Sequence, residues 1–337
     1  ISKWHLPLLR DGYFSLPATL CERPALKSLR AWSTAFGATI SLVVSVGCSR
    51  TYTSTFTANS IGSVTSGVAC DYSHNGMNAH PLVRLSSIAN WTCTSSARKL
   101  VANGVPDHDV GPFHIHPDLD FKIATQAISF SAPIAPVPTE TAKQIGGPQG
   151  DIGFMLNGVK IDPGTGGNCN DSGSSCTLLG RAGRWRMEAL GQTSFNFGAD
   201  SNNAHVQPGG VYHYHGIPAG FVKKLSKGQA MTLVGWAADG FPIYARYGFA
   251  EPNNATSAVK VIKSSYRTKA EPDAHRPASS LYPMGTFLQD YEYIAGLGDL
   301  DECNGRTGVT PEFPQGIYHY FATDTFPYLQ RCVKGAL

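Results

Sequence analysis

Short apolar runs separated by turn signals are the feature that most constrains the fold of this chain. Pairs such as Asn157-Gly158, Asp239-Gly240 and Asn304-Gly305 separate or punctuate the runs, as turns do between strands. Helical patterning is limited to residues 95–102 and 219–227. The runs of alternating or continuous apolar residues are 119–131, 151–161, 184–190, 231–247, 258–268, 289–295 and 316–323.

The composition agrees with a strand-and-loop protein. The 337 residues include 36 Gly and 22 Pro, which supply turns, and only 15% are charged. Such a chain is neither disordered, nor a coiled coil, nor a helical bundle. No linker rich in Pro divides residues 68–337. We therefore predict one mostly β, loop-heavy domain over 68–337, sandwich-like or barrel-like, with few short helices.

The cysteines predict three disulfides that close loops. The chain has eight cysteines, and six remain once Cys21 and Cys48 near the N-terminus are set aside. Six cysteines allow 15 pairings, but these fall into neighbouring couples and include no Cys-x-x-Cys metal or redox motif. Disulfides imply an oxidising compartment. The predicted pairs are Cys70/Cys93, Cys169/Cys176 and Cys303/Cys332.

The N-terminal region predicts export. Arg23, Lys27 and Arg30 precede a weakly apolar run at 35–44, which small residues follow; this order is typical of a signal peptide and is too short for a membrane span. A buried helix is the alternative interpretation. Residues 1–48 are thus predicted to be a leader and 49–67 a Ser/Thr-rich linker, in a secreted, extracellular protein. The chain begins with Ile1, and its first Met is Met77. Residues 1–22 are therefore interpreted either as an artefact of a translated reading frame or as part of a fragment.

Charge excludes two classes of partner. The net charge of +3 comes from the N-terminal residues, and the remainder of the chain is neutral without a Lys/Arg cluster. Neither nucleic acid nor an anionic membrane surface would be attracted to such a body. Sequons at Asn90, Asn170 and Asn254 are compatible with glycosylation of an exported protein.

Clustered histidines predict a transition-metal site. His213 and His215 lie two residues apart on a predicted strand, so both rings project from one face, about 6–7 Å apart at Cα. Imidazole ligands suit copper or zinc rather than calcium or magnesium. The alternative is that these histidines only make hydrogen bonds in a half-buried polar core. Candidates for further ligands are His205 and His319, followed by His108, His114 and His116.

Two segments of the chain have similar sequences. Residues 208–215 match residues 314–321 at five of eight positions, including Tyr-His-Tyr in both. Two such strands are expected to be equivalent or neighbouring in the fold. Because side chains alternate along a strand, each histidine should face one side and its flanking tyrosines the other.

Other catalytic signatures are absent from the sequence. It contains no Gly-x-Ser-x-Gly, His-Glu-x-x-His, phosphate-binding loop or dinucleotide-binding fingerprint. Asp239 follows an apolar run and is interpreted either as a general base or orienting carboxylate, or as the Asp of a β-turn. No reaction is assigned, and the substrate stays open.

The chain resembles the YHYH-domain family, named for a motif that stands here at Tyr212–His215. The resemblance covers roughly residues 100–332 and implies a secreted or surface-associated protein without an established activity. Two functions remain: a metal-binding protein, or an extracellular-matrix or biomineral-associated scaffold that self-associates and does not catalyse. The motifs that carry the resemblance are 102–108, 156–159, 203–210, 235–244, 298–306, 310–314, 318–320 and 326–328.

Overall fold

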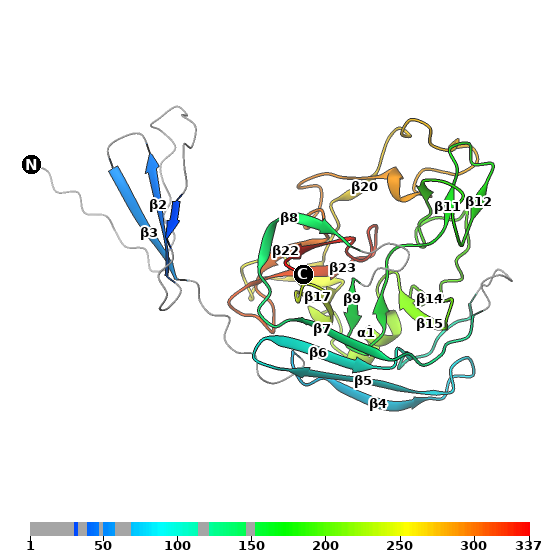
Figure 1. Ribbon diagram of the computed structural model, residues 1–337, viewed down its shortest axis with the longest axis horizontal. Coiled ribbons are helices and arrows are strands. Elements are labelled where there is room, and N and C mark those ends of the chain that lie inside the picture. Colours follow the sequence, from blue (N-terminus) through cyan, green and yellow to red (C-terminus); the bar gives the residue numbers. More distant parts are fainter. Residues whose placement is uncertain (1–29, 33–38, 47–49, 58–68, 114–120, 146–151) are drawn as a thin grey trace, which may run out of the picture. The chain divides into compact units, whose positions relative to one another are not determined.

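The computed structural model describes residues 30–32, 39–46, 50–57, 69–113, 121–145 and 152–337 (Figure 1). The chain divides into two units, Ile1–Gly62 and Ser63–Leu337. In the first unit β1 (Arg30–Trp32), β2 (Thr39–Val46) and β3 (Arg50–Thr57) form an antiparallel sheet. These strands fall within the segments interpreted as leader and linker, and export remains a prediction.

The second unit begins with a four-stranded antiparallel sheet. Its order is β4 (Ser73–Asn78), β5 (Leu85–Cys93), β6 (Ala97–Ala102) and β7 (Ile128–Pro133). The helix expected over 95–102 is therefore wrong. Burial alternates along β6, because every second side chain faces the core while β5 and β7 satisfy its backbone on both sides.

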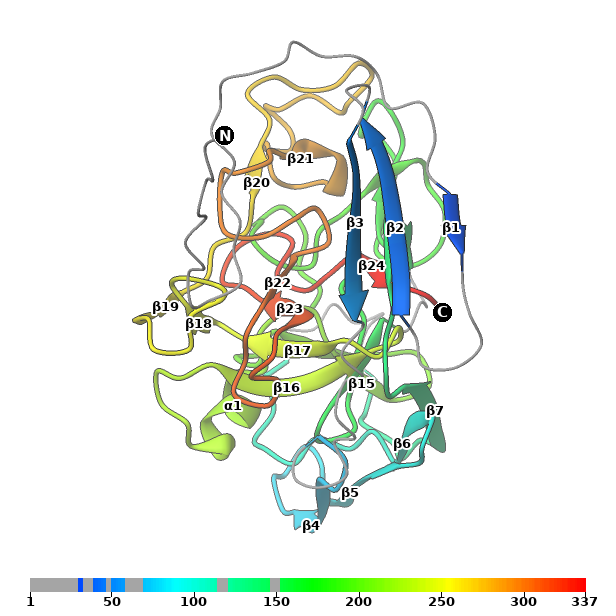
Figure 2. The same ribbon diagram turned by 90° about the vertical axis from the view of Figure 1, so that its left-hand side faces the viewer.

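A second, eight-stranded sheet carries most of the buried core. Its order along the sheet is β14-β15-β10-β9-β16-β17-β23-β22, and Figure 2 shows β17 between β16 and β23. The bounds are β9 (Gly153–Met155), β10 (Lys160–Ile161), β14 (Ala204–Gln207), β15 (Val211–Tyr214), β16 (Thr232–Ala237), β17 (Pro242–Ala245), β22 (Gly305–Gly308) and β23 (Ile317–Ala322).

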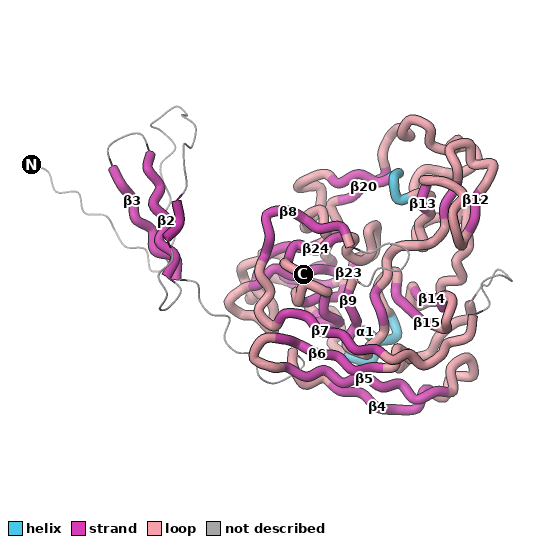
Figure 3. The backbone as a smooth tube through the Cα atoms, in the orientation of Figure 1, coloured by secondary structure: helices cyan, strands magenta, loops and turns pink. Residues whose placement is uncertain are grey.

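The four-stranded sheet packs against the eight-stranded one (Figure 3). Trp91 Nε1 donates a hydrogen bond to the Leu156 carbonyl at 2.9 Å. The guanidinium of Arg98 lies 3.3 Å from the ring centroid of Trp236. Both contacts join buried residues of the two layers. The predicted mostly β domain is therefore observed, in its sandwich-like form.

Short elements complete the unit. Among the described residues the helices are α1 (Ala219–Leu225) and the 3-10 turn η2 (Leu288–Asp290), and none is long and apolar enough to cross a membrane. All three predicted disulfides are present: Cys70–Cys93, Cys169–Cys176 and Cys303–Cys332. The remaining strands are β8 (Pro138–Gln144), β11 (Asn168–Cys169), β12 (Cys176–Thr177), β13 (Trp185–Arg186), β18 (Tyr247–Phe249), β19 (Val259–Val261), β20 (Tyr266–Thr268), β21 (Tyr291–Tyr293) and β24 (Cys332–Gly335).

The eight-stranded sheet consists of two copies of one four-stranded motif. Copy 1 is β9, β10, β14 and β15, and copy 2 is β16, β17, β22 and β23. In each copy the second strand pairs in parallel with the fourth, and the third and fourth form an antiparallel pair. The copies meet where Phe154 lies opposite Trp236 in the antiparallel β9–β16 pair. A twofold relation through this pair exchanges the two copies.

The sequences follow the same relation. Residues 153–161 correspond to 235–243 without a gap, so that the turn at Asn157-Gly158 matches the turn at Asp239-Gly240. The two Tyr-His-Tyr strands, β15 and β23, are therefore equivalent rather than neighbouring, with four strands between them. The similarity between residues 208–215 and 314–321 is thus one part of a larger internal repeat.

Candidate metal centre

The hairpin of β14 and β15 brings two histidines together. His205 lies opposite His213 in the antiparallel register, and opposite residues project from the same face. His215 follows His213 by two residues and therefore projects from that face as well. The three histidines form one cluster, referred to below as the His cluster.

The turn of the hairpin sets this register. Gly209 and Gly210 connect the strands with φ of +86° and +77°, a left-handed conformation that glycine adopts without strain. A Cβ on Gly210 would lie 2.5 Å from the Cβ of Ala124 and 2.8 Å from the Lys122 carbonyl. Gly210 thus provides both the turn and the space for a neighbouring segment.

The ring nitrogens of the His cluster converge. One potential ligand atom from each of His205, His213 and His215 lies within 4.8 Å of the others. The closest pair, Nε2 of His205 and Nε2 of His215, is separated by 3.0 Å. The ring centroids lie between 4.6 and 4.8 Å apart. Three imidazoles therefore point at one small volume.

Backbone contacts orient two of the rings. Nδ1 of His205 makes a hydrogen bond to the Phe197 carbonyl, and Nδ1 of His213 lies 3.2 Å from the Val211 carbonyl. A histidine that donates Nδ1–H to a carbonyl presents an unprotonated Nε2, which is the form that binds metals. Tetrahedral zinc ligands at about 2.0–2.1 Å lie roughly 3.3 Å apart. The donor set and its spacing fit a transition-metal ion after a small adjustment.

Burial keeps the cluster neutral. Desolvation lowers the pKa of His205 and holds the pKa of His213 and of His215 well below the usual value, and the neighbouring imidazoles act in the same direction on the latter two. His213 and His215 are only 2% and 1% exposed, whereas His205 is half-buried. Neutral imidazole is the ligand state.

Two further functional candidates lie on the same face, and the sequence analysis missed them. Strand β10 runs parallel to β15, with Lys160 beside His213, and Asp162 follows at the next position on that face. Lys160 Nζ and the Asp162 carboxylate form a buried ion pair of 3.0 Å. A comparison of the two copies could have pointed to them. At the positions of Lys160 and Asp162 copy 2 has Pro242 and Tyr244, so the charged pair occurs only in the copy that carries the three histidines.

A cavity of about 760 Å³ opens beside the His cluster. His205, His213 and Asp162 contribute to its wall, together with residues 164–168. Further lining residues come from β13 and the segment before it: Leu178, Leu179, Gly180, Arg181, Gly183, Arg184 and Arg186. An ion at the His cluster would therefore have room on one side for a ligand that the protein does not supply.

His319, predicted as a ligand, is not part of the His cluster. Strands β10, β9, β16 and β17 separate β23 from β15, five strand spacings or roughly 24 Å along the sheet. Nδ1 of His319 lies 2.9 Å from the Ile317 carbonyl, and its ring packs edge-on against Tyr244 and Phe321. The third histidine beside His213 and His215 is instead His205, the other candidate.

The remaining histidine candidates stay apart from the cluster. His108 uses both ring nitrogens, at 2.7 Å from the Asp109 carbonyl and 2.6 Å from the Tyr214 hydroxyl. Tyr214 projects from the face of β15 opposite to the histidines, as alternation predicts. His114 and His116 lie outside the described residues.

Asp239 lies in the turn between β16 and β17 and is fully buried. Its carboxylate accepts hydrogen bonds from the Tyr320 hydroxyl at 2.6 Å and from the backbone N–H groups of Phe241 and Gly335. Burial raises its pKa, which these bonds partly oppose. Strands β9 and β10 stand between β16 and β15, so Asp239 does not reach the His cluster. Asp239 thus stands at the turn position, and a catalytic role for it stays a prediction.

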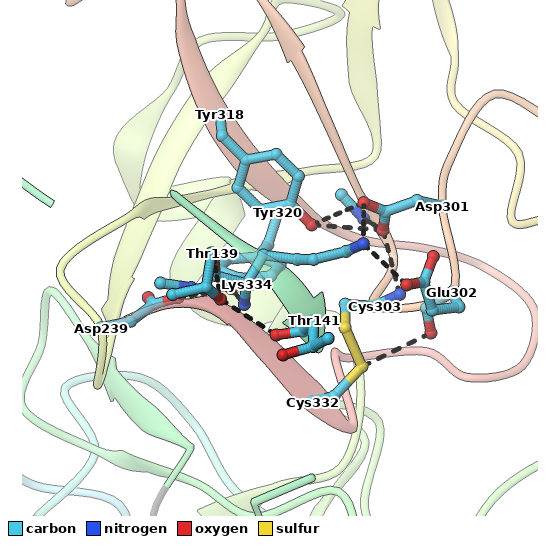
Figure 4. Close-up of a disulfide and its surroundings, with 12 residues drawn as sticks. Thr139, Thr141, Asp239, Asp301, Glu302, Cys303, Tyr318, Tyr320, Cys332 and Lys334 are labelled. Atoms are coloured by element: carbon cyan, nitrogen blue, oxygen red, sulfur yellow. Dashed lines mark hydrogen bonds and ion pairs between the residues drawn. A yellow bond between two sulfur atoms is a disulfide. The ribbon is translucent and has the colours of Figure 1, made fainter. Parts of the chain in front are cut away.

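Figure 4 shows the region beyond Asp239, around the Cys303–Cys332 disulfide. The Tyr318 hydroxyl donates to the Asp301 carboxylate at 2.9 Å, and Lys334 pairs with Glu302 at 2.7 Å. The last strand, β24, is attached to copy 2 by its backbone: Lys334 N–H donates to the Tyr320 hydroxyl at 2.8 Å and Gly335 N–H donates to the Asp239 carboxylate at 2.9 Å.

The three sequons differ in accessibility. Asn90 is exposed on β5, whereas Asn170 and Asn254 are half-buried and donate side-chain hydrogen bonds to Ser174 and Glu251. Asn90 is the most accessible acceptor of the three for a glycan.

The family model described as YHYH protein matches residues 129–335, more than half of the chain. The matched range contains both copies of the repeated motif and the whole His cluster. No curated protein and no solved structure matches the chain. The chain belongs to the YHYH protein family.

Proposed function

We propose that this is an exported protein that binds one copper or zinc ion through His205, His213 and His215. The observation that carries the proposal is the convergence of three ring nitrogens within 4.8 Å on the β14–β15 hairpin and the residue that follows it. Three neutral imidazoles match the preference of both metals, and a His₃ set with one free position is the ligand arrangement of many catalytic zinc sites.

The residues around the cluster support binding rather than a purely structural role. Hydrogen bonds from Nδ1 hold His205 and His213 so that Nε2 is left for the ion. The cavity leaves one side of that ion accessible, and a bound metal there would polarise an oxygen ligand. Histidines packed only as polar core would instead each face a separate partner, as His108 does.

Export is the second part of the proposal. Three disulfides in the second unit are compatible with an oxidising compartment, and the N-terminal basic and apolar segment has the order of a signal peptide. Expression with the full leader, followed by N-terminal sequencing of protein recovered outside the cell, tests this part by itself. Retention of uncleaved chain inside the cell contradicts it.

Metal content tests the first part. Wild-type protein, H213Q and the control H275Q are purified without metal affinity steps, loaded with zinc or copper, dialysed and measured by elemental analysis. His275 is exposed and does not belong to the cluster. We expect one ion per chain in wild type and in H275Q and almost none in H213Q. Equal content in all three, with thermal melts showing that each is folded, contradicts the proposal.

Assembly separates this function from a scaffold. If the protein forms filaments or lattices that persist in a chelator and carries no metal, the scaffold function replaces the proposed one. A metal-loaded monomer in size-exclusion chromatography with light scattering is the expected result.

A further inference from the structure

The cavity beside the His cluster has the size and the lining of a small-molecule site. Its volume of about 760 Å³ falls within the range of about 300–1,000 Å³ that is typical of ligand pockets. It borders His205 and His213 directly, so a bound molecule would reach the proposed ion.

Three arginines from one segment line this cavity. Arg184 makes a two-point ion pair with Asp171, at 2.9 and 3.0 Å. Arg181 and Arg186 form no ion pair with any residue that the structure describes. Guanidinium groups bind carboxylate and phosphate oxygens in a two-point geometry, and two of them are available here for an external partner.

The described lining of the cavity has little negative charge that would repel an anion. Among the lining residues that the structure describes, Asp162 is the acidic one, and Lys160 already lies 3.0 Å from its carboxylate. The arginines and a divalent ion would together make this cavity positive, in a chain whose second unit is otherwise close to neutral. Anions are therefore favoured over neutral or cationic ligands.

Apolar side chains form the rest of the wall. Phe121, Leu178, Leu179 and Phe197 contribute to it, and Leu179 is 44% exposed. A ligand that carries both an oxyanion and an apolar body would pair the first with arginine and bury the second against these residues.

We propose that this cavity binds a small organic anion, with its oxyanion group between the arginines and the metal and its apolar body against the leucine and phenylalanine side chains. The inference rests on the proposed metal site and names the class of its ligand. A carboxylate and a phosphate monoester share this chemistry, and the experiment distinguishes them.

Copy 2 supports the assignment by contrast. At the positions of His215 and Asp162 it has Phe321 and Tyr244, and these rings pack around His319 with centroid separations of 5.1 and 5.4 Å. Side chains thus fill the space that copy 1 leaves open. The open face is a property of the copy that carries the histidines.

Isothermal titration calorimetry on the full chain provides the test. Benzoate, phenyl phosphate and the neutral benzamide are titrated into zinc-loaded and metal-free wild type, into R181Q/R186Q, and into the control R84Q/R267Q, whose arginines lie outside the cavity. We expect benzoate or phenyl phosphate to bind zinc-loaded wild type at least about tenfold more tightly than benzamide, since charge-assisted hydrogen bonds are lost with the neutral probe. The tighter of the two anions identifies the oxyanion group.

The variants separate this inference from the metal proposal. R181Q/R186Q should keep its zinc content and lose about tenfold or more in anion affinity, while R84Q/R267Q keeps both. Anion binding unchanged in R181Q/R186Q, benzamide binding as tight as benzoate, or no binding of any probe overturns the inference. If the protein takes up no metal, the proposed function fails, yet anion binding that disappears in R181Q/R186Q still supports the anion cavity.

Discussion

The two copies of the repeated motif share one face and differ on the other. On the shared face, Tyr212 donates to Asp200 at 2.8 Å in copy 1, and Tyr318 donates to Asp301 at 2.9 Å in copy 2. Asparagines with φ near +55° to +61° precede both third strands. On the other face copy 1 has His205, His213 and His215, where copy 2 has Arg306, His319 and Phe321.

Strand alternation explains how this divergence is possible. Neighbouring side chains project from opposite faces of a strand. The tyrosines can therefore keep their hydrogen bonds on the shared face, referred to below as the frame, while the residues between them change. In copy 2 a permanent cation, Arg306, stands opposite His319 and donates to the Phe249 carbonyl at 2.7 Å. A guanidinium cannot bind a metal ion, so copy 2 retains the frame without the proposed function.

The largest predicted effect is a loss of stability when the Asp239 carboxylate in copy 2 is removed. D239A leaves the Tyr320 hydroxyl and two backbone N–H groups without their buried acceptor, which should lower the free energy of unfolding by about 4 kcal/mol. Urea denaturation measures this, with metal content determined on the folded fraction. A variant of unchanged stability that has lost its metal would instead return Asp239 to the functional site.

The acid stability of copy 2 should depend on His319. Burial lowers its pKa to about 4, while in the unfolded chain it titrates near 6.5. The unfolded state therefore binds the proton first, and stability present above pH 6.5 is lost as the pH falls towards 4, by about 3 kcal/mol for this group. Denaturation of wild type and H319Q between pH 7 and 4 measures it. Parallel curves for the two proteins would contradict the expectation.

Restoring ligands to copy 2 should create a second site. R306H/F321H places imidazoles at the positions that correspond to His205 and His215, around the existing His319. We expect metal content to rise from one to two ions per chain, with R306H alone staying at one. Elemental analysis decides this. If the folded double variant still binds a single ion, the frame alone does not position the ligands.

The smallest effect is expected at Asp162. Asp162 lines the same cavity as His205 and His213, but Lys160 offsets much of the charge of its carboxylate. D162N should weaken zinc binding about three- to tenfold, because residues around the ligands tune affinity less than the ligands do. Competition with a chromogenic chelator measures it, with Y244F at the equivalent position of copy 2 as the control. An unchanged affinity in D162N would place the ion pair outside the metal centre.

Local patterns explain what was predicted correctly from the chain alone. The couples of cysteines, the mostly β character, and the projection of His213 and His215 from one face all depend on residues near each other in sequence. The wrong helix at 95–102 arose because its short pattern fits either element, and only its pairing with β5 and β7 makes it a strand.

The sequence by itself determined the family, the disulfides and two of the three histidines of the cluster, because each is encoded in a short segment. Only the tertiary structure decided that His205 and not His319 completes it, that Lys160 lies beside it, and that Asp162 and the arginines of 181–186 line the same cavity as His205 and His213. His205 joins the cluster through the register of the β14–β15 hairpin, and Lys160 does so through the parallel pairing of β10 with β15, more distant in sequence. Strand order and register decide these neighbours, and the pattern of a single short segment encodes neither.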